Sequence, residues 1–181
     1  MKTMRRAHMG IGLLLCGLWA CAATDRGIYR NVGRTTKPHS RITLNTAGDH
    51  QERWQTNDIA IDFSYQREAD LFAMTGMAIQ MSGKVELQQR LYNFPVISYL
   101  RIWMHFLDEE GLILSTHRLW TASRHTDTRL IRFNFRRQYP LPPNATMLTF
   151  SYTGEMTDGG GRRGPGGRTG DRVDWSFWWT P

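Results

Sequence analysis

The side chains of this sequence that could do chemistry are few and widely spaced. His105 and His117 lie on either side of a short acidic turn in a strand-like region. If Leu107 pairs with Leu112 across that turn, the two imidazoles point to opposite faces of a sheet, where they cannot share a metal ion. The turn itself, Asp108–Glu110, lacks EF-hand spacing and indicates a solvated hairpin tip. We therefore expect no metal and no cofactor.

Nucleophilic catalysis also lacks a recognisable motif. Serine, histidine and aspartate all occur, but no GxSxG pattern places a serine on a nucleophile turn. The sequence contains two cysteines, Cys16 and Cys21, so the chain beyond residue 21 has no thiol for a disulfide, a metal or a nucleophilic attack. These observations predict that the protein is not an enzyme.

The N-terminal residues have the organisation of an export signal. Lys2, Arg5 and Arg6 precede an uncharged run, residues 9–19, that is rich in leucine and glycine. This run is about half as long as the roughly 20 residues that a membrane-spanning helix needs. A basic start followed by a short apolar segment and small residues is typical of a cleaved signal peptide.

The end of that segment, Leu18-Trp19-Ala20-Cys21, resembles the lipobox of bacterial lipoproteins. In that family a leucine and a small residue precede the lipidated cysteine, and Trp19 departs from the small residue usual at its position. The resemblance covers residues 1–21. It implies removal of a signal peptide, residues 1–20, and acyl chains on the sulfur and the new amino group of Cys21. The alternative is an ordinary cleaved signal in which Cys21 is incidental.

The residue after this cysteine and the net charge suggest a location and a kind of partner. An aspartate there would favour retention in the inner membrane of Gram-negative bacteria, so Ala22 implies the outer membrane, where we expect the periplasmic face. The formal charge is +7, and loss of the three basic residues of the signal leaves +4. A basic lipoprotein favours anionic envelope partners, namely a protein, an acidic glycan or lipopolysaccharide. Nucleic acid is not expected in that compartment.

The elements that must position any functional side chain are predicted to be strands. Residues 21–53 are polar and predict a tether with a short strand at 41–44, whereas a folded domain is expected over 54–181. Apolar and polar residues alternate with period two, which is typical of half-buried strands. The alternating stretches are 59–65, 98–107, 131–136, 148–152 and 173–179. Pro140, Pro142 and Pro143 interrupt the pattern.

We predict seven to nine strands and no helix after the signal. The fold class is all-β, an antiparallel β-sandwich that is immunoglobulin-like in the broad sense, with a closed barrel as the alternative. The turn before Leu112 fits this prediction, because Gly111 can adopt the positive φ that a tight hairpin needs.

The last part of the chain has two unusual compositions. Residues 158–172, DGGGRRGPGGRTGDR, could bind RNA or phosphate, but so much glycine favours a disordered loop between the last two strands. In the aromatic tail that follows, we expect Trp175, Phe177 and Trp179 in the core and Trp178 half-exposed at an edge. A sugar- or lipid-binding platform is the alternative for this tail.

The candidate binding surface comes from the less apolar faces of two predicted strands. If these strands are neighbours, their side chains form a patch of cations with one large aromatic ring, and arginine and tryptophan are enriched at interface hot spots. The residues are Arg101, Trp103 and His105 on one strand, and Arg132, Asn134 and Arg136 on the other. The sequence therefore predicts a membrane-anchored, non-catalytic binding or assembly module. The alternative is a hydrolase of envelope polymers, which would need a carboxylate pair or a nucleophile in a cleft.

Overall fold

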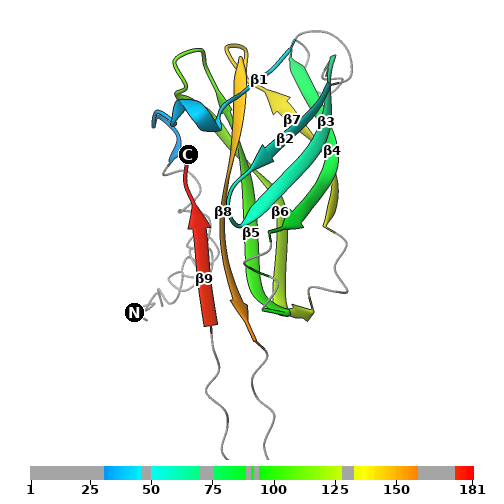
Figure 1. Ribbon diagram of the computed structural model, residues 1–181. Coiled ribbons are helices and arrows are strands. Elements are labelled where there is room, and N and C mark those ends of the chain that lie inside the picture. The colour runs from blue at the N-terminus through cyan, green and yellow to red at the C-terminus, as the bar shows by residue number, and fades with distance from the viewer. Residues whose placement is uncertain are drawn as a thin grey trace, which may run out of the picture. The chain divides into compact units, whose positions relative to one another are not determined.

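The computed structural model describes residues 31–45, 50–69, 76–88, 91, 94–127, 133–158 and 174–181, which belong to one compact unit starting at Asn31. Among these residues the strands form two antiparallel sheets that pack face to face, as Figure 1 shows. The predicted antiparallel β-sandwich is confirmed. The closed barrel does not form, because the strands divide between two separate sheets.

The larger sheet has five strands within the described part of the chain. Its order is β1-β8-β5-β6, and β9 also pairs with β8. The bounds are β1 Ile42–Thr43, β5 Val96–Leu107, β6 Ile113–Asp127, β8 Met147–Thr157 and β9 Asp174–Trp179. Because β5 occupies one edge of β8 along its whole length, β1 and β9 share the other edge, one beside each end of β8. Figure 1 shows this arrangement along the length of β8.

The smaller sheet has four strands in the order β2-β3-β4-β7. The bounds are β2 His50–Gln55, β3 Ile59–Ala69, β4 Met77–Leu87 and β7 Asn134–Leu141. The prediction that Pro140 interrupts its strand is wrong, since β7 continues through it to Leu141. β7 is an edge strand, where a residue without a backbone N–H is tolerated.

The core lies between the sheets and consists largely of the apolar faces that the alternating stretches predict. Full burial of one such side chain contributes about 1.5–3 kcal/mol relative to its exposure. The buried side chains include Ile59, Ile61, Phe63 and Tyr65 on β3, Leu100, Ile102, Met104 and Phe106 on β5, and Leu148, Phe150 and Tyr152 on β8.

Three tyrosine hydroxyls form hydrogen bonds between the two halves of the sandwich. Each combines a buried apolar ring with a polar tip that finds a partner on the other side of the core. Burial raises the pKa of Tyr139 to about 12, so that hydroxyl keeps its proton and donates. The contacts are Tyr152 Oη to Asp58 Oδ2 at 2.7 Å, Tyr139 Oη to the Arg118 carbonyl oxygen at 2.9 Å, and Asn45 N to Tyr65 Oη at 2.9 Å.

Removing one of these hydroxyls should destabilise the sandwich. We expect Tyr152→Phe to lower the free energy of unfolding by about 1–3 kcal/mol, because Asp58 is only 4% exposed and loses a charge-assisted partner. Urea unfolding of the full chain measures the change. Tyr99→Phe, on the outer face of β5, is the matched control and should change stability by less than about 0.5 kcal/mol. Equal losses in the two variants would contradict the bridging role of Tyr152.

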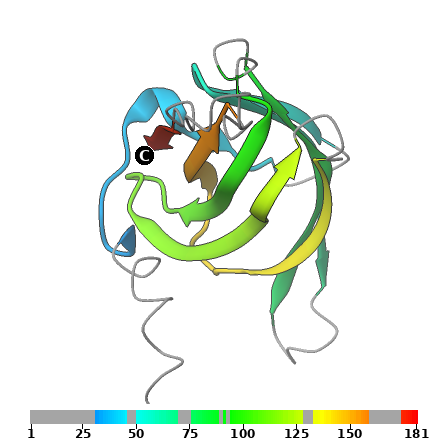
Figure 2. The same cartoon turned by 90° about the horizontal axis from the view of Figure 1, so that it is seen from below.

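The segment before β1 is ordered, and we call residues 31–41 the strap. It pairs with the start of β6, where Gly33 N donates to the Ile113 carbonyl oxygen at 2.9 Å. It then reaches β8, where Thr149 Oγ1 donates to the Ser40 carbonyl oxygen at 2.8 Å. Figure 2 shows this blue segment outside the larger sheet. The strap therefore crosses the outer face of that sheet from β6 to β8.

The strap moves the start of the fold earlier than the predicted boundary at residue 54. That boundary also falls inside β2, although the predicted short strand at 41–44 matches β1. The order of such a polar segment is not visible in a hydrophobic pattern, because hydrogen bonds rather than apolar side chains hold it in place.

Candidate functional site

The predicted binding patch depended on two strands being neighbours, and they are not. Arg101 and Trp103 lie on β5 in the larger sheet, whereas Asn134 and Arg136 lie on β7 in the smaller sheet. The described residues of this patch therefore do not form one surface. Arg132, like the lipidation candidate Cys21 and the Gly/Arg-rich run 159–172, lies outside the described residues.

His105, the sixth residue of that patch, is buried although it lies on the outward-facing side of β5. Its Nδ1 is 2.8 Å from Thr116 Oγ1 and its Nε2 is 2.7 Å from Ser151 Oγ. On β8 its register partner is Thr149, whose hydroxyl donates to the strap. Burial lowers the pKa of His105 from 6.5 to about 4, with a smaller contribution from His117.

The contact between Ser151 and His105 has the distance of a nucleophile and its base, but its environment indicates a structural role. An imidazole with a pKa of about 4 is a weak base at neutral pH. Both side chains are shielded from solvent, with Ser151 only 3% exposed, and a hydroxyl from Thr116 takes the place of an orienting carboxylate. The pair therefore satisfies buried polar groups within the larger sheet.

His117 lies on the inner face of β6, with its ring 5.7 Å from that of Phe106 and 5.1 Å from that of Tyr139. The two histidines thus point to opposite faces. The expected register of their hairpin is wrong, however, because Leu107 pairs with Ile113 rather than with Leu112. An irregularity between Phe106 and Leu107 then places His105 opposite Thr116. In the described part of the chain no three His, Cys, Asp or Glu side chains are grouped for a metal.

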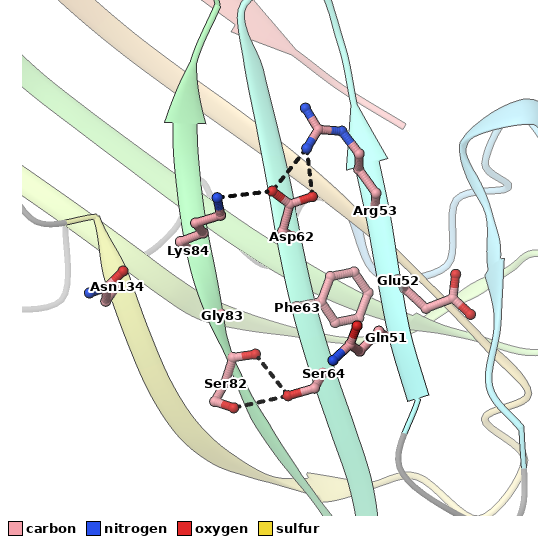
Figure 3. A pocket seen from close by; sticks show the side chains of 10 residues that line it. All are labelled: Gln51, Glu52, Arg53, Asp62, Phe63, Ser64, Ser82, Gly83, Lys84 and Asn134. Carbon is pink, nitrogen blue, oxygen red and sulfur yellow. Dashed lines mark hydrogen bonds and ion pairs between the residues drawn. The ribbon is translucent and has the colours of Figure 1, made fainter.

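The outer face of the smaller sheet carries an open polar hollow of about 630 Å³ beside Gly83, shown in Figure 3. Gly83 has no room for a side chain, since a Cβ there would meet the Asp62 carbonyl oxygen. The Asp62 carboxylate in the hollow accepts two hydrogen bonds from Arg53, at 2.7 and 2.9 Å, and lies 3.7 Å from Lys84 Nζ. These charges already compensate one another, so the hollow offers a ligand little unpaired charge.

The outer face of the larger sheet has a different character, with large aromatic rings around a cation. Arg101 pairs in register with Thr153, which pairs with Trp178 on β9, so the three side chains point outward in one row. Trp178 is 68% exposed. Tyr99 and Trp103 flank Arg101 along β5, and the Arg101 guanidinium lies 5.8 Å from the centre of the Tyr99 ring. We call these five residues the aromatic face.

The aromatic tail explains how one ring comes to be so exposed. Phe177 is buried, Trp179 packs edge-on against Trp54 at 5.0 Å, and Trp178 between them must point outward. The prediction that Trp175 lies in the core is wrong, because it is 42% exposed and stacks on Phe94 at 5.9 Å. In Figure 1 β9 begins below the strands of the smaller sheet.

Sequence reasoning identified Arg101 and Trp103 but not their grouping with Trp178. The outward position of Trp178 could be inferred from its place between two inward rings, but its neighbours on the surface come from strands far away in sequence.

No stretch within the described ranges forms a helix long and apolar enough to span a bilayer. Comparison of the chain with protein-family models, with curated proteins and with solved structures finds no match.

Proposed function

We propose that the protein is a lipid-anchored, non-catalytic binding module of the bacterial envelope. The observation that carries the binding role is the aromatic face, where Trp178 is 68% exposed beside the cation of Arg101. Exposed tryptophan and arginine side chains that gather on one surface are typical of binding sites. The partner is an anionic component of the envelope, since the exposed Arg101 can pair with a carboxylate or a phosphate.

The anchor is the acylated Cys21, which follows from the lipobox resemblance of residues 18–21. Two or more acyl chains hold a protein stably on a membrane, whereas one chain gives marginal binding. The residues between Cys21 and the strap then connect the membrane to the sandwich, and Ala22 favours the outer membrane.

Labelling in a bacterial host tests the anchor. We expect radiolabelled palmitate to enter the wild-type chain and Cys21→Ser to abolish both the labelling and the retention in the membrane fraction. Cys16→Ser is the matched control, because it changes the other cysteine of the sequence, and it should keep both properties. Equal labelling of wild type and Cys21→Ser would remove the anchor from the proposal.

A further inference from the structure

The rings of Trp178 and Trp103 on the aromatic face stand apart from each other. Neighbouring strands are about 4.8 Å apart and alternate residues about 6.8 Å apart along a strand. Trp178 lies two strands from Arg101, and Trp103 lies one alternate position further along β5. The backbones of the two tryptophans are therefore roughly 12 Å apart. This spacing suits an extended ligand that contacts both rings.

The surface between the rings is polar and is formed by short side chains. Three residues beside the aromatic side chains in these rows are exposed or half-buried and carry short hydroxyl groups. They are Thr121, Thr153 and Ser176. A protein partner generally buries a continuous apolar core. A sugar ring instead presents an apolar face to an aromatic ring and hydroxyls to polar neighbours, which matches this alternation.

The charge on the face indicates an acidic sugar. Arg101 is exposed, and within the described residues it makes no ion pair, only the contact with the Tyr99 ring. The same rows contain a second guanidinium, that of Arg118, and one carboxylate, that of Glu155, so positive charge is in excess. A guanidinium held in place by an aromatic ring is well suited to a bidentate pair with a carboxylate.

We infer that the aromatic face binds an acidic polysaccharide, with sugar rings on Trp178 and Trp103 and a uronic acid carboxylate on Arg101. This inference rests on the proposed binding role and names its ligand class. It does not depend on the anchor, so loss of palmitate labelling and loss of sugar binding are separate failures.

The test uses the full chain, purified in detergent, and titration calorimetry with oligosaccharides of galacturonate, alginate and hyaluronate. We expect at least one of them to bind, and its affinity should fall at high salt. A neutral malto-oligosaccharide should bind at least about tenfold more weakly. Poly-L-glutamate, which has carboxylates but no sugar rings, should not bind. Trp178→Ala should weaken binding by about tenfold, since one stacked ring contributes on that order.

Two further variants separate the components of the site. Trp175→Ala is the matched control, because it removes another exposed tryptophan of the same strand outside the aromatic face, and affinity should stay within about twofold of the wild type. Arg101→Gln should remove the preference for acidic over neutral sugars. Equal binding of poly-L-glutamate, full affinity in Trp178→Ala, or no binding of any of the three acidic sugars would each overturn the inference. Retention of an envelope protein that needs Trp178, without sugar binding, would identify a protein ligand instead.

Discussion

Acidification from about pH 7 to about pH 4 should lower the free energy of unfolding by about 3 kcal/mol through His105 alone. The unfolded chain takes up a proton near pH 6.5, whereas the buried imidazole resists protonation down to about pH 4. The stability is therefore complete above about pH 6.5 and is lost progressively as the pH falls through this window. His117, whose pKa is also lowered by burial, adds to the loss in the same direction.

Urea unfolding at a series of pH values measures this dependence. His105→Gln keeps a polar side chain between Thr116 and Ser151 but does not titrate, so its stability should fall less steeply in the same window. His39→Gln, at an exposed position of the strap, should follow the wild-type curve. Identical pH slopes in wild type and His105→Gln would show that the buried imidazole is not the source.

Phe106→Ala should cost about 3–5 kcal/mol, the range observed when a buried phenylalanine is truncated. The side chain is 0% exposed and packs against His117 inside the sandwich, so its removal leaves a cavity. Phe133→Ala should cost less, because Phe133 is only partly buried, against Trp120. Chemical denaturation of the full chain gives both values.

The matched control for Phe106 is Trp178→Ala. It removes a larger aromatic side chain that is 68% exposed, and stability should change by less than about 0.5 kcal/mol. A cost for Trp178→Ala that equals the cost for Phe106→Ala would mean that Trp178 is part of the core, and the aromatic face would then lose its central ring.

The alternation of side chains was sufficient to predict which faces form the core. Period two assigns Ile61 and Phe63 to one face and Asp62 to the other without knowledge of the partner strands, and the structure agrees. The turn at Gly111 could also be predicted from local sequence, because glycine tolerates the φ of +85° that is found there. Local chemistry therefore predicted strands, faces and one hairpin.

The pairing of strands distant in sequence could not be predicted in the same way. Whether β5 lies beside β7 or beside β8 depends on packing over the whole core, and the patch predicted from Arg101 and Arg136 failed for this reason. Irregular pairing shifted the His105 hairpin by local backbone geometry that no residue type specifies. The strap was missed because its order depends on hydrogen bonds to Gly111 and Ile113.

The position of the strap gives the molecule a defined response to mechanical force. A pull on the chain before Asn31 reaches the hydrogen bonds from Gly33 to Ile113 and from Thr36 to Gly111 before it reaches any strand of the core. These bonds would break first, and once the bond from Thr149 to Ser40 also breaks, the eleven residues 31–41 would release up to about 35 Å of chain. Under tension the strap would thus extend while both sheets stay folded.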